Sequence, residues 1–229
     1  MGLEEYGLGF FHCEECDDKG LITRQDESGV LYSRECSCMN RRRALRQLKE
    51  SGLDGIMSRY SFARYLTPDR KAEELKRAAE KYCDSPPAWF YISGRPGSGK
   101  THLCTAICGS FIRNGKAVFY CVWPEVVGKI KAMKTEDPVP PEYEKTMELL
   151  KTIAVLYIDD LFKGKATEAD YKIAFEILNA RYNNPKLRTI ISSELNLDRI
   201  KDDAIRGRIT ERAREYVLTA PGRDWRQTA

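Results

Sequence analysis

One short segment of the chain has the residue types and spacing needed to hold a polyphosphate. Residues 94–101 read Gly-Arg-Pro-Gly-Ser-Gly-Lys-Thr and match the phosphate-binding loop (P-loop) pattern G-x-x-x-x-G-K-T. Its glycines let successive backbone N–H groups turn inward around phosphates, and a following helix adds its positive dipole end. Lys100 would neutralise the outer phosphates, and Thr101 would ligate magnesium. The predicted nucleotide-binding residues are Gly94, Arg95, Pro96, Gly97, Ser98, Gly99, Lys100, Thr101 and His102.

A pair of acids at the end of an apolar run supplies the second part of such a site. Residues 153–160 read Ile-Ala-Val-Leu-Tyr-Ile-Asp-Asp, an apolar run of strand length that ends in two acids. Asp159 is predicted to hold the magnesium shell, and Asp160 to orient or deprotonate the attacking water. The assignment of these two acids to a nucleotide site is strengthened because a full P-loop precedes them, with one whole predicted strand, 117–122, between the two motifs.

Two later segments carry residues suited to sensing or stabilising phosphate charge. Ser193 ends the apolar run that begins at Leu187 and could report loss of the γ-phosphate through a hydrogen bond. The alternative is a serine that simply leaves a strand. Arg208 and Arg212 lie four residues apart on one face of a predicted helix. They form either a solvated face or a contact to a neighbouring subunit's site, where a guanidinium stabilises charge on the transferred phosphoryl group.

Four cysteines near the start of the sequence have the spacing of a metal site. Cys13 and Cys16 form a C-x-x-C pair, Cys36 and Cys38 form a C-x-C pair, and a hairpin-sized loop joins the two. This arrangement predicts a tetrahedral thiolate site for zinc. With four protein ligands no position is left for water, so the zinc would be structural. An iron–sulfur cluster or four unconnected thiols are the alternatives. The other four cysteines are typical of core packing.

The remaining sequence predicts the elements that must position these residues. From residue 88 onward, apolar runs of strand length alternate with helical periods. Such alternation indicates an α/β fold, with a mostly parallel five-stranded sheet flanked by helices. A proline-broken connection at 135–141 is expected to be exposed and mobile. The predicted strands are 89–93, 117–122, 153–158, 187–192 and 215–219, and the predicted helices are 100–114, 124–134, 168–183 and 202–213.

A small module is expected to precede this domain. Its predicted hairpin consists of residues 20–24 and 30–34 around a turn, and a basic helix is predicted at 40–51. A second amphipathic helix, 69–83, leads to the nucleotide-binding part. We therefore expect two domains, a zinc-binding module with a linker helix at 1–57 and an ATPase domain at 58–229.

Composition places the chain among ordinary soluble globular proteins. Of its 229 residues 42% are hydrophobic and 31% charged, which excludes disordered and fibrous classes. No apolar run approaches the length of a membrane span and no leader pattern opens the sequence, so we expect a cytoplasmic protein. A net charge of +4 is too small to establish a polyanion partner, although Lys and Arg cluster at 41–49 and 199–226.

Taken in order, these features resemble the bacterial and phage replicative helicase loaders of the DnaC/DnaI type, which are IstB/DnaC-like AAA+ ATPases. The resemblance covers both modules. It rests on the cysteine module, on Lys49-Glu-Ser-Gly-Leu53 and Arg59-Tyr-Ser-Phe62, on the P-loop, on Tyr157-Ile-Asp-Asp-Leu161 and on the arginine-bearing segment 206–212.

The resemblance implies a role for each site residue. Lys100 and Thr101 correspond to Walker A, Asp159 and Asp160 to Walker B, and Ser193 to sensor 1. Arg208 stands as the arginine finger with Arg212 as runner-up, and Arg226 occupies the place of a sensor 2 arginine. The sequence differs from the pattern of these relatives in three ways. Asp160 stands where many AAA+ proteins have a glutamate, Glu194 stands where relatives often have an asparagine, and no separate helical lid is expected.

The function implied by the resemblance is ATP-dependent loading of a hexameric DnaB-type helicase onto single-stranded DNA in replication initiation. The implied cofactors are ATP or ADP, Mg²⁺ and structural Zn²⁺. Hydrolysis would be slow and dependent on self-assembly through the arginine finger. Two alternatives remain: an IstB-like transposition ATPase, against which the cysteine module argues, and a zinc-bearing nucleotide-binding scaffold without turnover.

Overall fold

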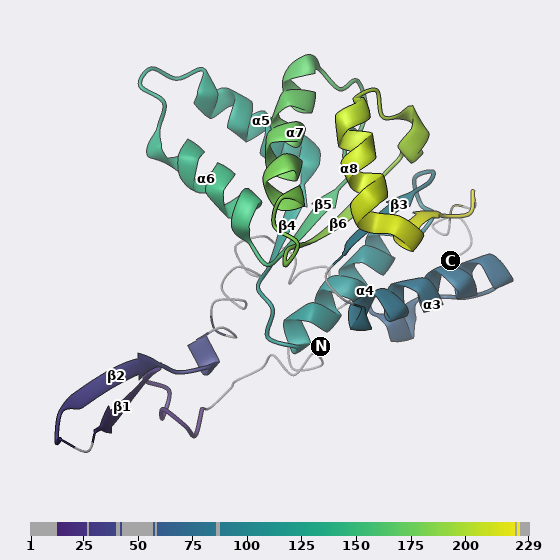
Figure 1. Cartoon of the computed structure of the whole chain (residues 1–229). Coiled ribbons are helices and arrows are strands. Elements are labelled where there is room, and N and C mark those ends of the chain that lie inside the picture. Colours follow the sequence, from purple (N-terminus) through teal and green to yellow (C-terminus); the bar gives the residue numbers. More distant parts are fainter. Residues whose placement is uncertain are drawn as a thin grey trace.

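A parallel sheet of five strands, in the order β4-β5-β6-β3-β7, forms the centre of the larger part of the molecule (Figure 1). The computed structural model describes residues 13–26, 28–39, 42, 57, 59–85, 88–222 and 224. The strands of the sheet are β3 Trp89–Ser93, β4 Val118–Val122, β5 Val155–Asp159, β6 Arg188–Ser193 and β7 Val217–Thr219. Because all neighbouring pairs are parallel, the carboxyl ends of the strands meet at one edge of the sheet.

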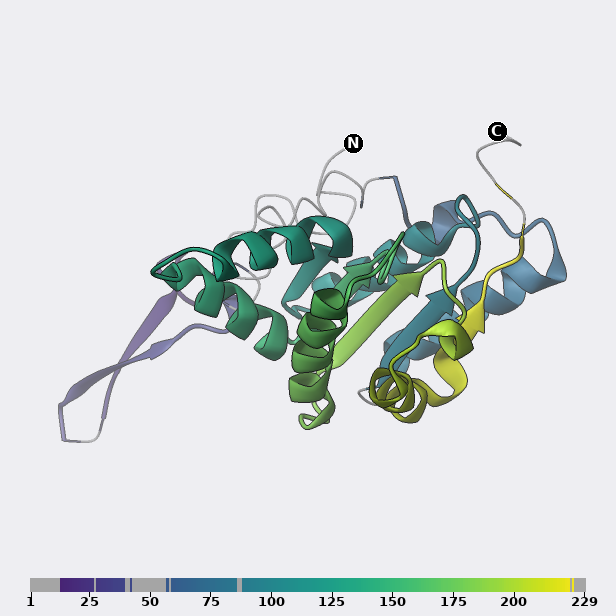
Figure 2. The same cartoon turned by 90° about the horizontal axis from the view of Figure 1, so that it is seen from above.

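Helices cover both faces of this sheet, as the views in Figures 1 and 2 show. The strand side chains alternate, so Phe90 and Ile92 pack in one core while Trp89 and Tyr91 pack in the other. The first core is closed by α3 Arg70–Asp84 and α4 Lys100–Arg113. The second is closed by α5 Trp123–Lys134, α6 Pro141–Thr152, α7 Glu168–Tyr182 and α8 Asp203–Ala213.

The predicted fold class is confirmed, and each strand and helix predicted from residue 69 onward ends within two residues of its expected bounds. At two helices, α3 and α7, capping residues explain why the predicted start agrees with the observed one. The Asp69 side chain accepts the N–H of Ala72 at the start of α3, and Thr167 and Asp170 form a capping box at the start of α7. Across the described ranges of the chain, no helix has both the length and the apolar character of a membrane span.

One helix, α6, was missed because the prolines before it had been interpreted only as breakers. Pro140 is its N-cap and Pro141 its first residue, a position that proline favours since its missing N–H has no partner there anyway. The C-terminal end of α6 is satisfied from a distant helix: Arg181 of α7 donates to the carbonyls of Leu150, at 3.1 Å, and of Ile153, at 2.9 Å. The preceding segment, residues 135–139, is exposed as expected.

The predicted hairpin is also present. Strand β1 Leu21–Gln25 pairs antiparallel with β2 Leu31–Glu35. Its turn is fixed by Asp26, whose carboxylate accepts the N–H groups of Ser28 and Val30, both at 2.9 Å. The helix predicted at 40–51 falls almost entirely outside the described residues, and its existence stays a prediction.

Candidate nucleotide and zinc sites

The predicted P-loop connects β3 to α4 at the carboxyl edge of the sheet. Gly97 has a φ of +77° and Gly99 a φ of +86°, conformations that glycine adopts readily and other residues rarely. A Cβ atom added at Gly97 would also lie 1.8 Å from a carboxylate oxygen of Asp224. Gly97 and Gly99 are thus required by backbone geometry, and Asp224 lies against this loop.

Lys100 is the first residue of α4, and only 5% of it is exposed. Its Nζ donates to the carbonyl oxygens of Gly94 at 2.8 Å and Arg95 at 3.0 Å, so the ammonium faces its own loop. Burial lowers the pKa of Lys100, and the negative charges of Asp160, Glu194 and Asp159 oppose that effect. The one buried cation of the loop therefore sits in the field of three carboxylates. This is the electrostatic setting in which a bound phosphate would meet Lys100.

Asp159, the last residue of β5, is surrounded by hydroxyl groups. Its carboxylate accepts from Tyr157 at 2.7 Å, from Tyr120 at 2.9 Å, from Thr101 at 3.3 Å, and from Ser192. Burial, and after it the charge of Asp159, raises the pKa of both tyrosines, so their phenols stay protonated and donate. These hydrogen bonds hold the Asp159 carboxylate in a fixed orientation beside Thr101. Oxygen ligands of this kind suit Mg²⁺, so the two predicted magnesium residues fit that ion.

The alternation of side chains along the strands explains why these hydroxyls converge. Tyr157 and Asp159 are two residues apart on β5 and share the face that packs against α4. Ser192 extends from the same face of the neighbouring strand β6, two residues after Ile190. Tyr120 extends from β4, the strand that pairs with β5 on the edge opposite β6. The sequence analysis missed Tyr120, Tyr157 and Ser192; for Tyr157 the two-residue spacing from Asp159 on the same strand was a usable signal.

Asp160 lies directly beyond β5, with a φ of +59° that turns the chain away from the strand. Its N–H donates to Ser192 Oγ at 3.1 Å, and its carboxylate accepts from Lys163 Nζ at 2.6 Å. The same ammonium lies 3.6 Å from a carboxylate oxygen of Glu194. The structure thus brings Asp160 next to the P-loop but ion-paired to a lysine that the sequence analysis did not single out.

Ser193, the predicted sensor, is fully buried and faces the opposite side of the sheet from Asp159. Its Oγ donates to the carbonyl of Leu161 at 2.7 Å and accepts the N–H of Leu195 at 3.1 Å. The structure therefore brings Ser192, and not Ser193, into contact with Asp159. The sensor role of Ser193 stays a prediction.

A pocket of about 450 Å³ opens beside the P-loop. Its far wall consists of Tyr60, Arg64, Tyr65 and Leu66, and its near wall of residues 97–102. The His102 ring lies with its centroid 4.9 Å from that of Tyr60 and 5.2 Å from that of Tyr65, and its Nε2 is 2.8 Å from the Ser61 carbonyl. A wall of aromatic side chains next to a phosphate loop fits a nucleoside base. The sequence analysis predicts His102 as a nucleotide-binding residue without assigning it to the base, and it does not include the two tyrosines.

The two candidate arginines of α8 are held against their own chain. Arg208 Nε donates to the side chain of Asn179 at 3.0 Å, and its guanidinium lies 4.7 Å from the centroid of the Phe175 ring. Arg212 donates to the carbonyl of Pro185 at 3.1 Å. Neither is among the described residues that line the pocket at the P-loop. Arg226, the predicted sensor 2 residue, lies outside the described residues.

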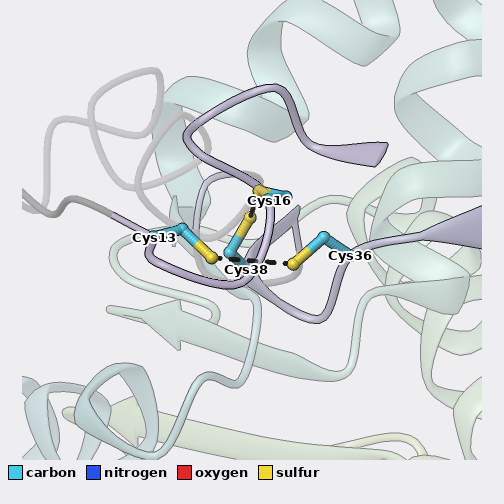
Figure 3. A group of neighbouring side chains, drawn as sticks. All are labelled: Cys13, Cys16, Cys36 and Cys38. Carbon is cyan, nitrogen blue, oxygen red and sulfur yellow. Dashed lines mark hydrogen bonds between the residues drawn. The ribbon is translucent and has the colours of Figure 1, made fainter. Parts of the chain in front are cut away.

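The four N-terminal cysteines converge on one point (Figure 3). Their sulfur atoms all lie within 4.8 Å of one another, with Cys13 and Cys36 at 3.6 Å and Cys16 and Cys38 at 3.5 Å. Tetrahedral zinc with bonds of about 2.3 Å places its sulfur ligands roughly 3.8 Å apart. Because all four thiols are buried and at this spacing, the cluster fits a zinc ion.

Backbone contacts hold the first cysteine pair in place. The N–H of Gly20 donates to Cys16 Sγ at 3.3 Å, and the N–H of Cys13 donates to the carboxylate of Asp18 at 3.0 Å. Gly20 has a φ of +76°, and a Cβ there would lie 2.6 Å from the sulfur of Met39. Contacts of this kind orient metal ligands, so the turn is shaped around the thiol cluster.

The parallel sheet, the P-loop and the Walker-type aspartate define a protein of the P-loop nucleotide-binding class. Comparison with known proteins supports this, since the family of IstB-like ATP binding proteins matches residues 18–207. The uncharacterized protein YqaM of Bacillus subtilis (strain 168) is 32% identical over 207 residues, which cover 83% of this chain and 64% of YqaM. The chain belongs to the IstB-like ATP-binding family.

Two further similarities point in the same direction. The replicative helicase loader DnaC of Buchnera aphidicola subsp. Schizaphis graminum is 28% identical over 189 residues, or 79% of this chain and 74% of that protein. A crystal structure of the DnaC helicase loader superposes with a TM-score of 0.61 at 20% identity, covering 72% of this chain and 98% of that one. The resemblance drawn from the sequence is confirmed for the family and the fold.

Proposed function

We propose that this chain is an ATP-dependent loader that binds a hexameric DnaB-type replicative helicase and delivers it to single-stranded DNA. The observation that carries the proposal is the complete P-loop and aspartate site on an AAA+ fold, in a chain that aligns over 79% of its length with a relative named as a replicative helicase loader. The chain spans 64% of the length of YqaM, so the activity of the whole protein is part of the proposal.

The nucleotide site would bind and hydrolyse ATP with Mg²⁺. Lys100 and the backbone of the P-loop would hold the phosphates, and Thr101 and Asp159 would hold the magnesium shell. Asp160 would orient the attacking water, with Ser193 as the predicted sensor. Because the arm of Asp160 is shorter than that of a glutamate, turnover would be slow.

Self-assembly would complete the site. Arg208, or Arg212 in its place, would reach the γ-phosphate held by a neighbouring copy, and Arg226 would contact the nucleotide from the C-terminal end. For Arg208 this requires release from Asn179 and Phe175, which hold it in the single chain. Hydrolysis would then act as a release switch, since it removes the group that joins two subunits.

The two predicted domains would have different binding partners. Residues 1–57, with zinc on Cys13, Cys16, Cys36 and Cys38, would bind the helicase. Residues 58–229 would bind ATP, oligomerise and contact DNA, with the basic cluster at 199–226 as the candidate surface for phosphates.

An IstB-like transposition ATPase is the second candidate, and the description of the matching family favours it. The cysteine cluster argues for the loader, because two of its four members, Cys13 and Cys16, lie before the matched residues 18–207. Binding preferences separate the two: a transposition ATPase would prefer duplex DNA and a transposase, and a loader would prefer single-stranded DNA and a helicase.

Co-expression of the full chain with its host replicative helicase, followed by native mass spectrometry with and without ATP, tests the proposal. We expect a helicase complex that retains zinc and whose composition changes with ATP. The Cys36→Ser variant should lose the helicase, whereas Cys83→Ser, which alters a cysteine outside the cluster, should retain it. Absence of any complex with the wild-type chain would contradict the loader function. Equal retention by both variants would contradict the role of the cysteine module.

A further inference from the structure

Lys163 lies between two acidic side chains at the edge of the nucleotide site. Its Nζ is 2.6 Å from Asp160 Oδ2 and 3.6 Å from Glu194 Oε1. Asp160 and Lys163 belong to the turn after β5, and Glu194 directly follows β6. The three side chains thus bridge the ends of two neighbouring strands. All three are partly exposed, so solvent weakens the bridge without removing it.

This bridge stands next to the start of the P-loop. Strands β3 and β6 are paired up to Ser93 and Ser193, and the N–H of Gly94 donates to the Ser193 carbonyl at 3.2 Å. Glu194, the residue after Ser193, therefore lies beside Gly94, the first residue of the P-loop. The charges of Asp160 and Glu194 both act on the pKa of Lys100, where they counter the larger effect of burial. Both carboxylates thus share a field with the ammonium that would meet the phosphates.

Two carboxylates at this position pose an electrostatic problem for a triphosphate site. The γ-phosphate is the terminal group, and its charge would come close to Asp160, Glu194 and Asp159. Asp159 would be offset by the magnesium it helps to hold. Asp160 and Glu194 have a different counter-charge, since both contact Lys163. Without that ammonium, two negative charges would face the terminal phosphate.

We propose that Lys163 is a positioning residue of the triphosphate site, which offsets the charge of Glu194 and holds the carboxylate of Asp160 beside the γ-phosphate. The proposal rests on the nucleotide-binding part of the proposed function and is independent of the helicase and DNA. It also accounts for Glu194: an acid is tolerated at the end of β6 because a lysine from the neighbouring turn neutralises it.

Discrimination between nucleotides gives the proposal a specific signature. Loss of Lys163 should weaken binding of a triphosphate and leave a diphosphate nearly unaffected, because ADP has no γ-phosphate near Glu194. A purely structural ion pair would affect both nucleotides alike. Removal of the Glu194 charge in the same chain should restore triphosphate binding, since one negative charge then leaves together with the positive one.

The test is calorimetric titration of the full chain with Mg²⁺ and either ADP or a non-hydrolysable ATP analogue. We expect Lys163→Met to weaken binding of the analogue by about tenfold and of ADP by less than about twofold. Lys163→Met with Glu194→Gln should return to within about threefold of wild type. Lys165→Met, which removes the same charge from an exposed lysine two residues away, should bind as wild type does. Lys163→Arg, which keeps the charge, should preserve the preference for the analogue.

Equal weakening of both nucleotides by Lys163→Met, no weakening at all, or failure of Glu194→Gln to restore binding would each overturn the proposal. Unfolding temperatures of all variants show whether a loss reflects misfolding, and Lys163→Gln, which also removes the charge, carries the test if Lys163→Met does not fold. A wild-type chain that binds neither nucleotide would overturn the proposed function together with this inference. A chain that binds both but captures no helicase would contradict only the loader function.

Discussion

The nucleotide site and the cysteine cluster are built in opposite ways. In the nucleotide site the functional groups hold one another: Lys100 donates to two loop carbonyls, and four hydroxyls donate to Asp159. These groups stand at the edge of a sheet with a core on each face. Among the described residues, the cysteine cluster has a core of four thiols, with Ile22 and Met39 beside it, and its hairpin strands are almost entirely exposed.

This difference predicts where each site obtains its stability. Four protein hydroxyls donate to the carboxylate of Asp159, so its geometry is preorganised. An isolated two-stranded hairpin is marginal in water, and a metal ion held by four thiolates contributes folding free energy directly. The nucleotide site should therefore survive loss of its ligands, and the cysteine module should not survive loss of zinc.

The largest expected effect comes from breaking the cysteine cluster. Cys36→Ser, or treatment with a strong chelator, should lower bound zinc from about one equivalent to near zero and unfold the hairpin. The unfolding temperature of the parallel-sheet body should change by less than about 2 °C, since its two cores contain none of these cysteines. Metal analysis and differential scanning calorimetry measure the two quantities. Cys83→Ser is the matched control, and a hairpin that stays folded without metal would refute the contrast between the two sites.

The next largest effect should come from Asp159. Asp159→Asn keeps the size of the side chain but removes the charge that would hold the magnesium shell, so phosphate release should fall by about a hundredfold or more. Steady-state phosphate release at several Mg²⁺ concentrations measures this. Activity that is close to wild type at saturating Mg²⁺ would show that another group holds the metal.

A smaller effect is expected from the tyrosines that orient Asp159. Tyr157→Phe removes a fully buried donor at 2.7 Å and should weaken the apparent Mg²⁺ affinity by about tenfold or more, because a hydrogen bond to a charged group contributes about 1.5–3 kcal/mol. Tyr120→Phe removes a half-buried donor at 2.9 Å and should cost about twofold to threefold. The Mg²⁺ dependence of phosphate release provides the comparison. Identical values for both variants and the wild type would mean that the hydroxyls do not position the metal ligand.

The smallest effect is the difference between two adjacent serines. Ser192→Ala removes a donor to Asp159 and should change the Mg²⁺ dependence, whereas Ser193→Ala removes the hydrogen bonds to Leu161 and Leu195. Both variants should lose about 1–2 kcal/mol of stability, because each leaves a buried polar group without its partner. Urea unfolding and phosphate release separate the two effects. A larger loss of phosphate release in Ser193→Ala would instead favour its predicted sensor role.

Much of the fold and of the site was predictable because their signals are local. The P-loop pattern, the acids after an apolar run and the caps at Asp69 and Thr167 are each contained in a few consecutive residues. The cysteine spacing also specifies its cluster, since the hairpin brings the two pairs together. In these cases the residues that determine the geometry are close to one another along the chain.

The features that were missed depend on contacts between distant segments. Helix α6 begins at prolines that the sequence analysis interpreted as breakers, and its end is satisfied by Arg181, which is 28 residues from Ile153. The pairing of Lys163 with Glu194 joins two loops that become neighbours only when β5 and β6 pair. Which of two adjacent serines faces Asp159 depends on the register of β6, which no local pattern revealed.

The most direct test of the account is calorimetric titration of the folded wild-type chain and of Lys100→Ala with ATP and Mg²⁺. We predict a saturating heat of binding at one nucleotide per chain for the wild type, and at least about hundredfold weaker binding for the variant, which lacks the cation of the P-loop. No heat with the wild type, or the same affinity in both proteins, would contradict the assignment of this loop as the nucleotide site.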